Sequence, residues 1–245
     1  MRISIELVPR SSESVLAEAR MLQSRFPSVT MLNVPDLLRF PLRSWDAVAL
    51  IMQHYPMSVP HLRAIDIPPT GPLPMADTLS RIGVREVVIV SGDPSQDMRR
   101  KVYPTTVVEV VRRFKRELPG IKIYAAYDPY RQGIRAERDY VNRKLDAGVD
   151  GFFTQPFFDV RLMEIHAEQL EGLRTFWGIA PVLSDRSKSY WETTNQVIFP
   201  RAFKPALAWN QAFAEQALAF VRNAGGSVYF MPIRVDLASY LTGLL

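Results

Sequence analysis

Four consecutive β-branched residues, Val87-Val88-Ile89-Val90, are typical of a parallel strand that is covered on both faces. After a loop, Thr105–Leu118 shows the helical period, with one apolar stripe opposite a row of Arg and Lys residues. Pro119-Gly120 ends this helix, and Lys122–Tyr127 is again a short apolar run. Strand, helix and strand in this order predict two parallel strands joined by a right-handed crossover.

The same alternation extends along the whole chain. The expected strands are Ile3–Leu7, Val29–Val34, Ser58–Ile65, Glu86–Ser91, Lys122–Tyr127, Gly151–Gln155, Phe176–Pro181 and Val228–Met231. The expected helices are Ser12–Arg25, Trp45–His54, Ala76–Ile82, Thr105–Leu118, Arg135–Ala147, Val160–Leu170, Lys188–Gln196 and Ala206–Asn223. Closing eight such repeats leaves no exposed sheet edge, whereas an open doubly wound sheet, the alternative, has two. We therefore predict an α/β fold, a (β/α)8 TIM barrel. Because no linker marks a boundary, we expect a single domain over residues 1–245.

Composition excludes several classes of protein. Apolar residues make up 47% of the 245 residues and charged residues 22%, as in a globular protein with a substantial core. No apolar run approaches the roughly 20 residues of a membrane span, and Glu6 interrupts any signal peptide, so a cytoplasmic location is expected. The chain has no cysteine and only three histidines, which argues against thiolate chemistry and a zinc site. A homo-oligomer is compatible with the sequence.

Polar residues follow most of the predicted strands, where a barrel would gather them at one mouth. They are Glu6, Asn33, His61, Ser91-Gly92-Asp93, Tyr127, Thr154-Gln155 and, after the eighth strand, Arg234. Glu6 follows three residues of an apolar strand, where lost solvation would raise its pKa toward that of a general acid. A salt bridge to Arg10 is the alternative for Glu6, and an Asx turn is the alternative for Asp93.

A net charge of +5 favours anionic ligands. There is no GxGxxG and no GxxxxGK[ST] motif, so a nucleotide would be held in another way. Arg131, Arg135, Arg143, Lys144 and the run Arg99-Arg100-Lys101 are candidates for binding phosphate, although such runs are more often solvated helix faces. Nucleic acid is disfavoured because the aromatic residues lie in strands and helix stripes instead of alternating with a basic patch.

Several stretches carry a more specific pattern. Ile5–Arg10 matches E-x-x-P-R, Ser91–Pro94 is close to R-G-D-x-P, and Ala125-Ala126-Tyr127 is close to A-x-Y-P. Lys144–Asp150 and Thr154–Asp159 together are close to K-V-D-A-G-A-D…T-Q-x-F-F-D. In this order, and with Pro60-His61-Leu62 and Gly178–Val182, the motifs resemble the methylenetetrahydrofolate reductase family over nearly the whole chain.

The resemblance implies an oxidoreductase that reduces 5,10-methylenetetrahydrofolate to 5-methyltetrahydrofolate with hydride from NAD(P)H through FAD. It implies that Glu6 is the general acid, that Asp93 tunes hydride transfer and that Gln155 contacts the folate pterin. It matches Arg234 to a folate-side arginine. It places at the flavin Asn33, His61, Ser91, Gly92, Asp93, Tyr103, Ala126, Tyr127 and Lys144, with Glu137 or Asp139 at the ribose.

The departures from the family pattern leave alternatives open. Asn33-Val34-Pro35 stands where the family has T-Y-G, and Ser91 stands for the arginine of R-G-D. Because these positions lie on the flavin side, one alternative is direct hydride transfer from NAD(P)H without a flavin. A second is a non-catalytic subunit that binds folate or a partner protein.

Overall fold

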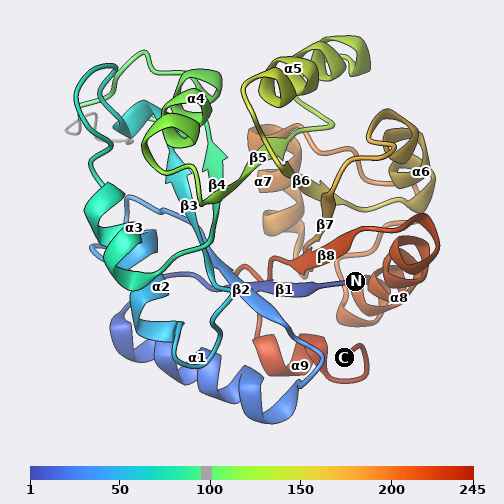
Figure 1. Ribbon diagram of the computed structural model, residues 1–245. Coiled ribbons are helices and arrows are strands. Elements are labelled where there is room, and N and C mark those ends of the chain that lie inside the picture. Colours follow the sequence, from blue (N-terminus) through green and yellow to red (C-terminus); the bar gives the residue numbers. More distant parts are fainter. Residues whose placement is uncertain (95–100) are drawn as a thin grey trace.

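The strands form a closed parallel barrel in chain order, with β8 returning to pair with β1 (Figure 1). The computed structural model describes residues 1–94 and 101–245. The strands are β1 (Ile3–Glu6), β2 (Met31–Val34), β3 (Val59–Arg63), β4 (Glu86–Val90), β5 (Lys122–Tyr127), β6 (Gly151–Phe157), β7 (Thr175–Ile179) and β8 (Ser227–Phe230). The predicted (β/α)8 barrel is thus confirmed, and the open doubly wound sheet was wrong.

Helices cover the outside of this barrel, as Figure 1 shows. They are α1 (Ser12–Arg25), α2 (Ser44–Ile51), the 3-10 turn η1 (Ala64–Asp66), α3 (Ala76–Ile82), α4 (Val107–Glu117), α5 (Ile134–Asp146), α6 (Val160–Gln169), α7 (Asp185–Asn195), α8 (Leu207–Ala224) and α9 (Leu237–Leu241). The sequence did not predict η1 or α9, since elements of three and five residues are too short to show a period. The turn η1 also explains why β3 stops at Arg63, before the predicted Ile65.

Local hydrogen bonds fix where the helices start. Ser11 and Thr106 cap α1 and α4, and each forms a reciprocal pair with the third residue of its helix. At α4 the Glu109 carboxylate accepts from the backbone N–H of Thr106 at 2.7 Å. Such capping satisfies N–H groups that the first helical turn leaves unpaired. The loop after β4 therefore leads into a helix whose first turn is capped.

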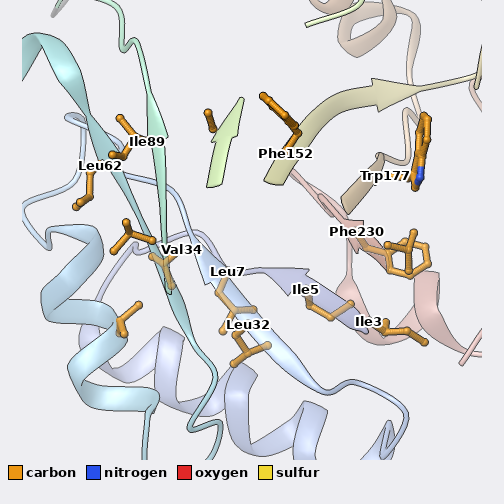
Figure 2. Packing of buried hydrophobic residues seen from close by; sticks show 14 of the residues in the cluster. Ile3, Ile5, Leu7, Leu32, Val34, Leu62, Ile89, Phe152, Trp177 and Phe230 are labelled. Atoms are coloured by element: carbon orange, nitrogen blue, oxygen red, sulfur yellow. The ribbon is translucent and has the colours of Figure 1, made fainter. Parts of the chain in front are cut away.

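Strand alternation divides the buried side chains into two layers. Figure 2 shows the outer layer, in which Ile3 and Ile5 of β1, Leu32 and Val34 of β2 and residues of later strands pack between barrel and helices. The inner layer fills the barrel; it includes Met31, Val59, Val88, Tyr124, Phe153, Phe176 and Tyr229. The rings of Phe153 and Phe176 stack with centroids 4.2 Å apart. The barrel is therefore a packed core and not a channel.

Arg2 closes the amino-terminal end of the barrel. Its guanidinium donates to Glu86 Oε2 at 2.6 Å and to the Tyr124 hydroxyl at 2.6 Å, and it lies 4.7 Å from the Phe176 ring centroid. A cationic group that is partly buried needs such partners. Across residues 1–94 and 101–245, no helix has the combined length and apolar character that a bilayer crossing requires.

Candidate active site

A cavity of about 430 Å³ opens where β3, β4, β5 and β6 end. Cavities of roughly 300–1,000 Å³ are typical of small-molecule and cofactor sites. Of the residues predicted for the site, the structure brings together around this cavity His61, Ser91, Gly92, Asp93, Ala126, Glu137, Lys144 and Gln155. The first and the last of them, His61 and Gln155, are 94 residues apart in the sequence. The parallel strands bring them to one end of the barrel, as the fold requires.

Glu6 lies beside this cavity without lining it and is connected to it through Asn33. The Asn33 Nδ2 donates to Glu6 Oε2 at 3.2 Å and lies 3.1 Å from His61 Nε2, and His61 lines the cavity. The register of the strands creates this row, because Glu6 pairs with Asn33 across β1 and β2. The alternative salt bridge from Glu6 to Arg10 was wrong, since Arg10 pairs with Glu18 at 3.4 Å.

Burial alters the pKa values of both titratable ends of this row. Desolvation raises the pKa of Glu6 to about 7, opposed by the hydrogen bond from Asn33. Desolvation lowers the pKa of His61 to about 4. At neutral pH the glutamate is therefore close to half protonated, and the imidazole is uncharged. A carboxyl group that exchanges its proton near pH 7 can act as a general acid.

Lys144 forms the cationic wall of the cavity. Its Nζ donates to the carbonyl oxygen of Ala126 at 2.6 Å, lies 3.6 Å from Glu137 Oε1 and lies 3.8 Å from the ring centroid of Tyr140. The lysine and glutamate side chains are only 3% and 4% exposed. Burial lowers the pKa of Lys144 to about 8, and the charge of Glu137 opposes this effect. The ammonium group thus stays mostly charged at pH 7, where it can attract an anion.

The loop carrying Asp93 depends on a residue without a side chain. Gly92 has a φ of +82°, and a Cβ there would lie 3.0 Å from Arg63 Cβ. The Arg63 guanidinium donates to the carbonyl oxygen of Asp93 and, through Nε, to Asp66 Oδ2 at 3.1 Å. The hydrogen bond from Arg63 therefore holds the backbone of the turn. The Asp93 side chain remains exposed at the rim of the cavity.

Gln155 reaches the cavity from an irregular part of β6. The pairing of β6 with β7 shifts register between Phe153 and Pro156. Such irregularities redirect side chains and are frequent beside active sites. Thr154 stabilises the stretch, because its hydroxyl accepts the N–H of Gly178 at 2.9 Å and its carbonyl oxygen accepts the Tyr229 hydroxyl.

Besides Glu6 and Asn33, several predicted residues do not line the cavity: Tyr103, Tyr127, Arg135, Asp139 and Arg234. Tyr127 points to the outer layer, where its hydroxyl lies 2.5 Å from His166 Nδ1 on α6, because it follows inward-facing Ala126 by one residue. The backbone N–H of Tyr103 donates to Ile65 O, and Arg234 is exposed in the loop after β8 with a φ of 57°. Arg99 and Arg100, candidates for binding phosphate, lie outside the described residues.

The cavity also contains residues that the sequence did not single out. They are Asp36, Leu37, Arg63, Val90, Val107, Gln132 and Tyr140. Arg63 follows His61 by two positions on β3, so strand alternation alone places both on one face. Residues 1–94 and 101–245 contain no cluster of three or more metal-ligating side chains.

Comparisons with known sequences point to one protein family. A sequence profile of methylenetetrahydrofolate reductase matches residues 15–218. The 5,10-methylenetetrahydrofolate reductases of Escherichia coli (strain K12) and Shigella flexneri are each 28% identical over 104 residues. These alignments cover 42% of this chain and 35% of each relative, so the matched part spans about a third of their length.

Solved structures share the fold. An uncharacterized protein from Clostridium thermocellum, described as binding two copies of 5-methyl-5,6,7,8-tetrahydrofolic acid, superimposes with a TM-score of 0.63 at 12% identity, over 98% of this chain and 93% of that one. A 2,3-dimethylmalate lyase superimposes with a TM-score of 0.60 at 11% identity, over 96% and 75%. At such identities the likeness concerns the barrel, whereas the profile match covers most of the sequence. The chain therefore belongs to the methylenetetrahydrofolate reductase family.

Proposed function

We propose that this chain reduces 5,10-methylenetetrahydrofolate to 5-methyltetrahydrofolate with hydride from NAD(P)H through bound FAD. The observation that carries the proposal is Glu6, a desolvated carboxyl group beside the cavity of a member of this family. The reaction consumes one hydride and one proton. A pKa of about 7 suits Glu6 to supply that proton to the bridging nitrogen, which opens the methylene bridge to its reactive iminium form.

The other predicted residues take their roles from the cavity. Gln155 lines it from β6 and Asp93 from the loop after β4, and both would hold the polar edge of the pterin. Arg234, exposed beyond β8, is available to the carboxylates of a folate. Acceptors and donors fixed in a partly buried site orient a ligand at little cost in entropy.

The cavity also fits a flavin nucleotide in its chemistry. Arg131, Arg143 and Lys144 line one part of it and would hold phosphate groups, and Glu137 would accept from a ribose hydroxyl. Gly92, which carries no side chain, lets the loop that lines the cavity pack closely against Arg63. When bound, FAD would supply the hydride acceptor and donor between NAD(P)H and the folate.

Direct hydride transfer from NAD(P)H, without a flavin, is the second candidate. One observation favours it: the Asn33 side chain, predicted to contact the flavin, does not line the cavity and is instead bonded within the barrel to Ser4 and Glu6 and close to His61. Both candidates use the same proton donor and give the same product. They differ in whether the purified protein carries a flavin.

The test is an anaerobic incubation of the purified chain with NADH and methylenetetrahydrofolate, with the product identified by mass spectrometry. The proposal predicts 5-methyltetrahydrofolate and a flavin absorption band that NADH bleaches. Product without a flavin band would support direct transfer. Binding of methylenetetrahydrofolate without turnover by NADH or NADPH, with FAD added, would reject both and leave the non-catalytic subunit.

A further inference from the structure

The amide of Asn33 is engaged on both of its ends inside the barrel. Asn33 is completely buried, and its Oδ1 accepts from the Ser4 hydroxyl at 2.7 Å. Its Nδ2 donates to Glu6 Oε2 at 3.2 Å and lies 3.1 Å from His61 Nε2. The three partners come from β1 and β3, on either side of β2. One side chain therefore connects the carboxyl group and the imidazole.

The directions of these bonds determine where His61 carries its proton. An amide nitrogen has two hydrogens and cannot accept. With one hydrogen directed to Glu6, the second is directed to His61 Nε2, which must then be the unprotonated ring nitrogen. Because burial lowers the pKa of His61 to about 4, the ring is neutral at pH 7 and carries its one proton on Nδ1.

The Nδ1–H of His61 has no partner among residues 1–94 and 101–245, although the ring lines the cavity. A polar group beside a cavity with no partner in the protein is available to a ligand. The ring is held by an edge contact with Phe153, whose centroid lies 6.2 Å away. His61 is thus a rigid, uncharged donor whose orientation is set from within the barrel.

We infer that Asn33 is a positioning residue, which holds His61 as the Nδ1–H tautomer so that it donates a hydrogen bond to a carbonyl oxygen or ring nitrogen of a bound heterocycle. The tautomer is independent of the reaction, whereas its effect on turnover rests on the proposed function. The opposite arrangement has a flipped amide, a protonated Glu6 that donates to Oδ1, and a His61 proton on Nε2. The two arrangements thus predict opposite tautomers.

The test is a long-range ¹H–¹⁵N spectrum of the histidine-labelled, full-length protein near pH 7. The chain has only three histidines, and His61→Gln identifies the signals of His61. The inference predicts a pyrrole-type Nδ1 and a pyridine-type Nε2 in the unmodified protein. A pyrrole-type Nε2 at His61 of the unmodified protein would overturn it.

Asn33→Asp tests the role of the amide directly, because a carboxylate at that position accepts from Nε2–H. We expect the His61 proton to move to Nε2 and kcat/KM to fall about tenfold, the range for one lost hydrogen bond. Asn223→Asp, an exposed control on α8, should change neither. An unchanged Nδ1–H tautomer in Asn33→Asp would contradict the inference. If the tautomer moves as expected but the unmodified protein has no reductase activity, the proposed function fails and the assignment stands.

Discussion

Lys144 Nζ donates a 2.6 Å hydrogen bond to the carbonyl oxygen of Ala126, which places a buried ammonium group directly against the end of β5. The only carboxylate paired with it among the described residues is Glu137, 3.6 Å away on the same helix. The charge of Lys144 at this wall of the cavity is thus balanced mainly by the Glu137 carboxylate of the protein itself. This arrangement makes the wall sensitive to removal of either partner.

Lys144→Met should destabilise the fold by about 3–5 kcal/mol, because it leaves the Glu137 carboxylate buried without its cationic partner. Chemical denaturation measures this change. Lys115→Met is the matched control: Lys115 pairs with Asp150 at 2.7 Å, but both side chains are about a third exposed. Its cost should not exceed about 1 kcal/mol. Equal costs for the two variants would mean that the buried pair has no special importance.

Gly92→Ala should weaken ligand binding at the loop that carries Asp93. A Cβ there would lie 3.0 Å from Arg63 Cβ and force the turn away from the arginine. Gly71 has the same φ of +82° with no atom near its Cβ position, so Gly71→Ala isolates the backbone effect. Both variants should lose about 1 kcal/mol of stability, and Gly92→Ala more. Only Gly92→Ala should raise the Kd for folate, measured by calorimetry; equal effects would exclude a role for the contact with Arg63.

The stability of the protein should fall as the pH rises through the range where Glu6 titrates. The folded-state pKa of about 7 lies above the ordinary value of 4.5, so the folded protein holds this proton more tightly than the unfolded chain. The penalty is absent below pH 4.5, grows between pH 4.5 and 7, and reaches about 3 kcal/mol above pH 7.

Glu6→Gln removes this penalty. Relative to the unmodified protein, the variant should therefore gain stability between pH 5 and pH 8, as denaturation at each pH would measure. Glu192→Gln, on the exposed face of α7, should show no such trend. A stability difference between Glu6→Gln and the unmodified protein that stays constant with pH would show that Glu6 titrates normally.

The repeat of strand and helix could be predicted from the sequence because each unit carries its own pattern. Apolar runs such as Val87–Val90 and stops such as Pro119-Gly120 mark the elements without reference to the rest of the fold. The short elements η1 and α9 could not be found in this way. Their ends depend on single contacts, such as the 2.7 Å bond from the Ser239 N–H to Asp236.

The cavity could be predicted only in part, since strand ends locate a mouth but not the direction of each side chain. Ala126 and Tyr127 are neighbours in the sequence, yet alternation puts one at the cavity and the other against His166. Strand alternation from His61 would have identified Arg63. The register shift in β6, and the connection of Glu6 to His61 through Asn33, arise from pairing between strands and have no local signal.

The central claim, that Glu6 supplies the proton, is tested most directly by the two half-reactions of Glu6→Gln. In anaerobic stopped-flow experiments, NADH should reduce the bound flavin of the variant at close to the unmodified rate. Transfer to methylenetetrahydrofolate should be about 10² to 10⁴ times slower, the usual contribution of a general acid. Formation of 5-methyltetrahydrofolate by Glu6→Gln at the unmodified rate would contradict the account.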